Sequence, residues 1–188
     1  MAAAGYSGLV QCYLNIDQPT AAANLAAGLV ARDSGLAGEL APFQAEAAWQ
    51  LGQWQDLNQY CREGSQPCWE MDLSRVVLAA YRADRTLFQR EIKAARKDIL
   101  KTLSAVSSEQ SAYSKSYLHI GRLAMLREVE TVTERLLLVK PGGDGDTLVQ
   151  NLGTILDEFE SRLNYTQISW SNLEPILRLR RGIFNAGN

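Results

Sequence analysis

The residue types best suited to catalysis or metal binding are few in this chain and lie far apart. His119 is the only histidine, and Cys12, Cys61 and Cys68 include no Cys-x-x-Cys pair. This pattern supplies no four-ligand zinc site within one chain. His119 also has no nucleophile at a recognisable spacing, so we expect a helix-surface or partly packed histidine rather than an acid–base catalyst.

The cysteines are expected to be reduced thiols in the core of an intracellular protein. Their number is odd, and a secreted helical domain of this size would not be expected to leave a thiol unpaired. A Cys61–Cys68 disulfide across Gly64-Ser65-Gln66-Pro67 is the less favoured alternative.

The glycine-rich run from Lys140 to Asp146 resembles a phosphate or calcium loop only superficially. A P-loop needs a lysine and a hydroxyl residue directly after its last glycine, where this chain has Asp146. An EF-hand loop beginning at Asp144 needs glutamate at its twelfth position, where this chain has Ile155. We therefore expect a flexible surface loop near 140–147 and no cofactor or metal. Solvated charge explains three carboxylates farther along, Asp157, Glu158 and Glu160.

One set of charges has a defined geometry. Helical periodicity puts four cations on the side of one predicted helix opposite its apolar residues, which makes them a candidate partner-binding basic face: Arg90, Lys93, Lys97 and Lys101. An ordinary solvated face explains the same pattern. No aromatic residue interleaves with the cations, and the chain carries a net charge of −2, so we expect no specific binding of nucleic acid.

Composition places the chain among ordinary globular proteins. Its 188 residues, 46% hydrophobic and 21% charged, suffice for one sizeable core. No apolar run is long enough to cross a membrane, and Met1 to Ala4 do not form a signal peptide.

Helical periodicity then describes the elements that position these residues. In the first part, about 5–106, apolar residues recur at helical spacing on both sides of three bends near Asp17, Gln53 and Asp84. The bends are about 36 and then about 31 residues apart, near the period of roughly 34 of tetratricopeptide hairpins. The central bend is the most regular, since Gly52 can end one helix and Trp54 begins the next. Pro42 puts the start of the helix before this bend no more than about a turn earlier.

The second part, about 109–185, predicts longer helices separated by the 140–147 loop. The first of them has apolar residues on two faces and is expected to be buried between neighbours. Asn172 with Pro175 is expected to begin the last helix, whose broad apolar face needs a partner. The fold class is therefore all-α, with antiparallel tetratricopeptide-like or HEAT-like hairpins stacked as an α-α solenoid. The chain is expected to be one helical-repeat segment, 1–188, cut from a much larger protein.

Several stretches of residues resemble one protein family. They are Glu46-Ala47-Ala48-Trp49, Gln53 to Leu57, Ser104 to Glu109, His119 to Leu123, Arg162 to Gln167 and Glu174 to Arg181. Together they make the chain similar, over roughly residues 6–184, to the FAT region of the phosphatidylinositol 3-kinase-related protein kinases, and within that family to its DNA-damage checkpoint members.

The resemblance implies a role rather than a site. A FAT region is a non-catalytic helical solenoid that embraces the kinase domain. It transmits the effect of activator and partner binding to the kinase domain, and it contributes to dimerisation. The expected partners are the kinase domain and other helical repeats of the same parent chain, and the expected location is the nucleus. The alternative is a free-standing tetratricopeptide-like adaptor that binds peptides or proteins.

Overall fold

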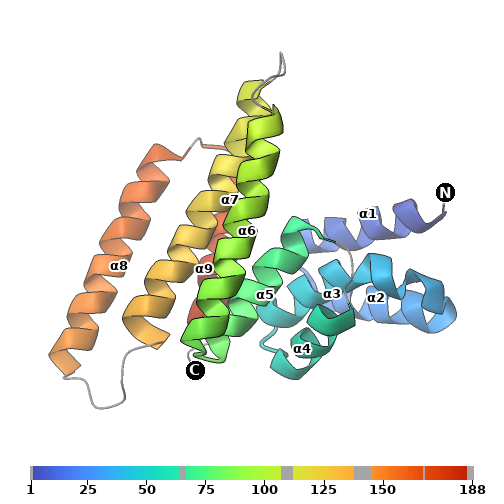
Figure 1. Cartoon of the computed structure of the whole chain (residues 1–188). Coiled ribbons are helices and arrows are strands. Elements are labelled where there is room, and N and C mark those ends of the chain that lie inside the picture. The colour runs from blue at the N-terminus through green and yellow to red at the C-terminus, as the bar shows by residue number, and fades with distance from the viewer. Residues whose placement is uncertain (1, 64–66, 107–111, 138–144, 167, 186–188) are drawn as a thin grey trace. The chain divides into compact units, whose positions relative to one another are not determined.

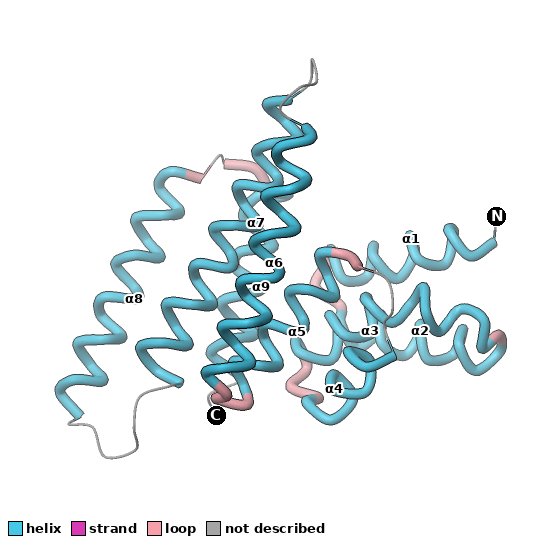
Figure 2. Tube along the Cα trace, in the orientation of Figure 1, coloured by secondary structure: helices cyan, strands magenta, loops and turns pink. Residues whose placement is uncertain are grey.

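A computed structural model describes the chain except for residues 1, 64–66, 107–111, 138–144, 167 and 186–188. All regular elements of the described residues are helical, and none of them is a strand (Figure 2). The all-α prediction is confirmed. The chain divides into two compact units, Met1–Leu78 and Ala79–Asn188, and α5, Trp69–Tyr81, leads from one to the other. The expectation of a single helical-repeat segment stays a prediction.

The first unit contains successive antiparallel hairpins. Its helices are α1 (Ala2–Asn15), α2 (Pro19–Arg32), α3 (Ala37–Gln50) and α4 (Trp54–Glu63), with a 3₁₀ turn at Ser34–Leu36 (Figure 1). Its core is built from small and branched side chains: Val10, Leu14, Ala22, Ala26, Leu29, Leu40 and Ala47. Small side chains such as these alanines suit closely packed helices.

The three predicted bends share a left-handed residue at the second position after a helix. Its φ is +59° at Asp17, +71° at Gly52 and +51° at Ala83. After α3, Gly52 N donates to Trp49 O at 3.4 Å and Gln53 N donates to Ala48 O at 2.8 Å, which closes the helix as a Schellman motif. Glycine takes this conformation without strain, whereas Asp17 and Ala83 do not. This difference is why only the Gly52 bend had a recognisable sequence signature.

Two helix starts differ from the prediction. Pro42 and Pro175 both lie inside a helix, because α3 begins at Ala37 and α9 (Trp170–Asn185) begins at Trp170. Each proline is therefore the sixth helical residue and not part of the first turn. At Pro42 the missing N–H forfeits a hydrogen bond to Gly38 O, but the ring is buried, and that burial offsets part of the loss.

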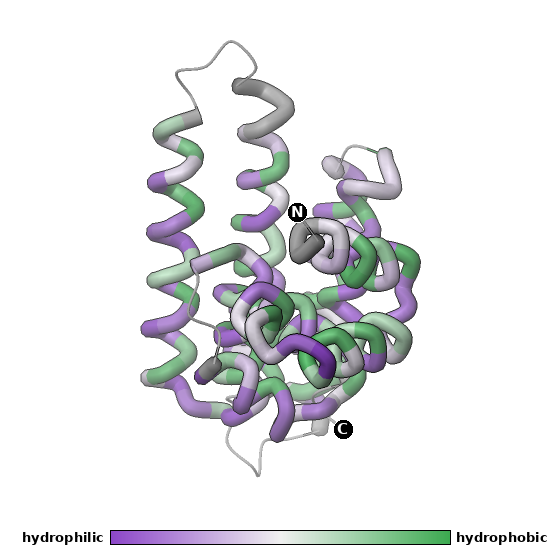
Figure 3. Tube along the Cα trace, turned by 90° about the vertical axis from the view of Figure 1, so that its right-hand side faces the viewer, coloured by the Kyte–Doolittle hydropathy of each residue, from purple (hydrophilic) through white to green (hydrophobic). Residues whose placement is uncertain are grey.

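The second unit is organised around α7. Its helices are α6 (Arg85–Val106), α7 (Ala112–Val132), α8 (Gly145–Tyr165) and α9, with a π-helical turn, Thr133–Leu137, after α7. The α7 helix contacts α6, α8 and α9, and it runs between α6 and α8 in Figure 1. Hydrophilic and hydrophobic stretches alternate along the long helices in Figure 3, as expected for helices buried on one side.

The prediction that α7 is buried on two faces is wrong for its first half. Met125, Val129 and Val132 are buried, but Leu118 and Ile120 are each more than half exposed. Between these two, His119 is only 7% exposed. Hydropathy therefore misassigned the inward side of this stretch, and the expected surface or partly packed histidine is a buried one.

Most of the predicted loop at 140–147 lies outside the described residues, and α8 begins at Gly145. No described helix is long and apolar enough to span a membrane.

Candidate partner-binding face

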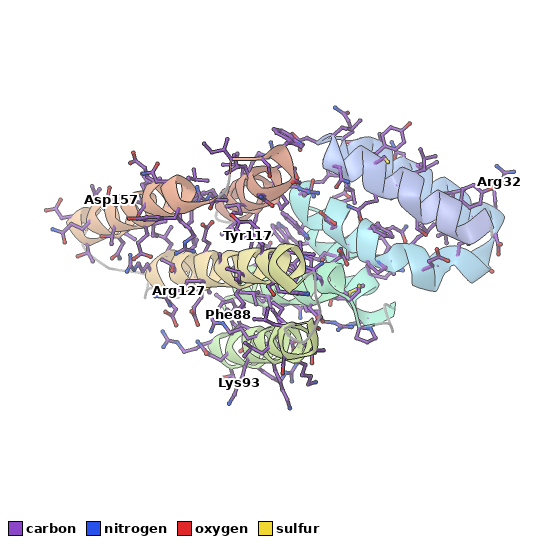
Figure 4. The ribbon with its side chains drawn as sticks, turned by 90° about the horizontal axis from the view of Figure 1, so that it is seen from above. Arg32, Phe88, Lys93, Tyr117, Arg127 and Asp157 are labelled. Atoms are coloured by element: carbon purple, nitrogen blue, oxygen red, sulfur yellow. The ribbon has the colours of Figure 1, made fainter. Side chains whose placement is uncertain are left out.

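The predicted basic face lies on α6, opposite the side that packs into the unit. Phe88, Ile92, Ala95 and Ile99 are all buried, which confirms the inward side of this helix. Figure 4 shows Phe88 between α6 and α7, and Lys93 pointing away from both.

The four cations of this face are not equivalent. Arg90 contacts Glu91 at 2.7 Å and Lys101 contacts Asp98 at 2.6 Å, so both have a neutralising neighbour. Lys93 and Lys97 are exposed and make no ion pair with any described residue. The candidate face therefore has two free charges at its centre, not four.

An apolar side chain belongs to this face and was missed by the sequence reasoning. Leu100 is 53% exposed and follows Lys93 by seven residues, so the two lie on the same side of α6. The sequence alone could have shown this exposure, because Leu100 does not fall at the helical spacing that puts Ile92 and Ile99 on the buried side.

A buried ion-pair network lies in the interior of the second unit. Glu128 on α7 is fully buried, and Arg180 on α9 donates to its two carboxylate oxygens at 2.8 and 2.7 Å. Arg180 also donates to Phe159 O at 3.0 Å, and its guanidinium lies 4.2 Å from the Phe159 ring centroid. Arg162 of α8 approaches Glu128 at 3.5 Å. One carboxylate thus joins α7, α8 and α9.

A second ion pair joins α6 to α7. Arg96 donates to both carboxylate oxygens of Glu130, at 3.0 and 2.7 Å, and Arg127 adds a bond at 2.9 Å. These hydrogen bonds, that of Arg96 above all, hold the pKa of Glu130 below its ordinary value, and the bond to Glu130 raises the pKa of Arg96.

Both networks were missed because hydropathy assigns charged residues to the surface. Glu128 lies at helical spacing from Met125 and Val132, and Arg180 lies at helical spacing from Ile176 and Ile183. The sequence could have indicated the pair, because it puts an acid on the apolar face of one helix and a base on the apolar face of another.

None of these features makes a catalytic site. The described residues hold no group of His, Cys, Asp and Glu that could bind a metal ion. An open hollow of about 470 Å³ beside α8 is lined by Asp157, Glu158, Ser161, Arg162 and Tyr165. Glu158 pairs with Arg135 at 2.8 Å and Arg162 donates to Ala124 O at 3.0 Å, so two of its three charged groups hold helices together.

The histidine and the cysteines belong to different units, His119 to the second and the three cysteines to the first. Burial, followed by the charge of Arg122, lowers the pKa of His119, and its Nδ1 is buried without a hydrogen-bond partner among the described residues. Burial raises the pKa of the Cys68 thiol. Cys12, Cys61 and Cys68 form no disulfide, so the alternative Cys61–Cys68 disulfide is wrong. Cys61 and Cys68 are partly buried, but Cys12 is exposed, so the expected place in the core is wrong for Cys12.

Comparison with known proteins identifies the family. A sequence profile of the FAT domain matches residues 41–188. The chain belongs to the FAT-domain family. As a FAT-domain segment it is a non-catalytic, kinase-associated helical region, and the family resemblance of the sequence is confirmed.

Curated relatives point to one kinase. The chain is 28% identical over 154 residues to the serine/threonine-protein kinase ATR of Oryza sativa subsp. indica and equally to that of subsp. japonica, covering 74% of this chain. It is 25% identical to ATR of Arabidopsis thaliana over 198 aligned positions, covering 96% of this chain. The matched part spans only 6–7% of those relatives.

Proposed function

We propose that this chain is a helical scaffold of an ATR-like serine/threonine checkpoint kinase, which supports and regulates the kinase domain in DNA-damage and replication-stress signalling. Its partners are then the kinase domain and other helical repeats of the parent chain, with regulatory proteins and a second parent molecule as further candidates. The parent acts in the nucleus.

The observation that carries this proposal is the FAT-domain match over 41–188 together with similarity to ATR from two plant species. The second unit supports it physically. Its helices are cross-linked by buried ion pairs, so a displacement of α9 is resisted by α7 through Arg180 and Glu128. A rigid linkage of this kind can transmit a partner's binding through the helices.

The test places variants in the parent kinase encoded by the natural reading frame. Glu128→Ala should lower kinase activity on a peptide substrate at matched protein concentration, because it uncouples α7 from α9. Asp56→Ala, which removes an exposed carboxylate of α4 that makes no ion pair with any described residue, is the control and should leave activity unchanged. Normal activity of a folded Glu128→Ala parent would refute the scaffold role.

A second measurement addresses catalysis by the chain itself. The isolated 188-residue chain with Mg²⁺ and ATP should show no phosphotransfer. ATP turnover that a point substitution within the chain abolishes would contradict the proposal. A reading frame that ends without a kinase domain would favour the free-standing adaptor.

A further inference from the structure

One side of α8 carries an apolar surface that the described residues leave exposed. Val149, Leu152 and Leu156, here called the α8 stripe, are 68%, 38% and 58% exposed. They lie at i, i+3 and i+7, on one side of the helix. The buried residues of α8, Ile155 and Phe159, follow Leu152 by three and seven positions. The stripe therefore borders the core-facing side of the helix, and Val149 and Leu156 are its more exposed members.

The stripe has an acidic border. Asp157 directly follows Leu156, and Glu160 follows Leu156 by about one helical turn. Both carboxylates are exposed and make no ion pair with any described residue. Glu158 and Arg162 behave differently, since they pair with Arg135 and Glu128. The unpaired carboxylates thus border the stripe, and the paired charges hold α8 in place.

The attachment of α8 means that the stripe is presented without rearrangement. Asn151 donates to Arg135 O at 3.2 Å, at the π-helical turn, and Arg162 donates to Ala124 O at 3.0 Å. Together with the Arg135–Glu158 pair, these bonds secure α8 along its length on the side away from the stripe. A surface that is already ordered loses little conformational entropy when it binds.

We propose that the α8 stripe is a docking surface for a basic amphipathic helix of a protein partner. Apolar anchors at i, i+3 and i+7 match the ridge that one helix offers to another. The border carboxylates Asp157 and Glu160 select lysine or arginine on the flanks of the partner, and they repel nucleic acid and anionic membranes. This inference rests on the surface of the chain itself and is independent of the kinase role.

The test uses two labelled helical peptides of about four turns. Both carry leucines at i, i+3 and i+7; one has lysines and the other glutamates on the flanks. Fluorescence anisotropy with the 188-residue chain should show the lysine peptide binding about tenfold or more tightly than the glutamate peptide. Equal affinity of the two peptides overturns the proposal.

Two variants locate the site. Val149→Ser with Leu156→Ser should weaken binding of the lysine peptide about tenfold or more. The matched control is Leu100→Ser on α6, which removes a leucine of similar exposure, 53% against 58%, and should leave the affinity unchanged. An affinity that the α8 variant leaves unchanged, or that the α6 variant lowers equally, overturns the proposal.

A charge reversal decides the outcome even if the serine variant fails to fold. Asp157→Lys with Glu160→Lys should reverse the preference, so that the glutamate peptide binds more tightly. An unchanged preference for the lysine peptide argues against this docking mode.

Sedimentation of the chain without peptide tests whether a second copy of the chain occupies the stripe instead. Self-association that Leu156→Ser abolishes would assign the stripe to a second copy.

Discussion

Arg180 on α9 and Glu128 on α7 form a two-bond ion pair, at 2.8 and 2.7 Å, between residues 52 positions apart in the sequence. The carboxylate has no exposed surface, so its charge is compensated entirely by protein groups. Removing either partner leaves a buried ion without compensation, whereas removing both does not.

Glu128→Ala should therefore destabilise the chain by about 3–5 kcal/mol. The double variant Glu128→Leu, Arg180→Leu should recover most of this loss, because apolar side chains of similar volume need no charge partner. Denaturant unfolding of the two variants and the wild type measures the difference. A double variant as unstable as Glu128→Ala would show that the pair specifies the packing of α7 on α9.

The two tryptophans of the central bend should respond differently to truncation. A fully buried tryptophan loses roughly 3–5 kcal/mol on truncation to alanine. Trp54, which begins the helix after the bend, is only half-buried, whereas Trp49 is 2% exposed. Trp49→Ala should therefore cost about 3–5 kcal/mol, and Trp54→Ala about 1–2 kcal/mol. Thermal midpoints of the two variants that fall in the opposite order would contradict this assignment.

Acidification should destabilise the chain through His119. Burial lowers its folded pKa, so the unfolded chain binds more protons below about pH 6.5, and stability falls as the pH decreases through that value. Unfolding of wild type and His119→Gln at a series of pH values measures the slope. The variant should lose less stability between neutral pH and pH ~5.5. Parallel slopes would mean that His119 does not titrate differently on folding.

A second loss of stability is expected in more acidic solution. The folded pKa of Glu130 is lowered, first by the bond from Arg96, so its contribution is present above the unfolded pKa of about 4.3 and is lost as the pH falls through the folded value. Arg96→Ala should flatten this step. Its control is Arg90→Ala, which removes a cation of the same helix that does not contact Glu130.

The basic face of α6 should bind DNA weakly and without sequence preference. Lys93 and Lys97 are its free cations, so the salt dependence should correspond to about two phosphate contacts, and binding should vanish near physiological salt. Lys93→Glu with Lys97→Glu should abolish it and leave the fold intact, whereas Arg90→Glu with Lys101→Glu should have less effect. Salt-resistant binding that the first variant loses would indicate a real nucleic-acid site.

Hydrogen exchange should be slower in α9 than in α8. The sequence suggested that the last helix leaves a broad apolar face uncovered, but Ile176, Leu179 and Ile183 are buried and Phe184 meets Phe159 edge to face at 6.3 Å. The helix α8 instead buries few apolar side chains and is attached by polar bonds, which favours local opening. Faster exchange in α9 than in α8 would contradict this order.

The sequence by itself determined the helices and their bends. Periodicity depends only on which residues are apolar, so it placed the inward side of α6 and the turns near Asp17, Gly52 and Asp84 correctly. It also carried the family, since FAT-domain similarity lies in the order of residues.

Only the tertiary structure decided which charges are buried and which apolar residues are left exposed. Hydropathy assigns a charge to the surface, but a base on another helix can compensate a buried acid, as Arg180 compensates Glu128. It likewise assigns every leucine to a core, although a helix can be packed on one side only, as Leu156 and Leu100 show. The partner of each side chain is set by residues distant in sequence, which a local pattern does not contain.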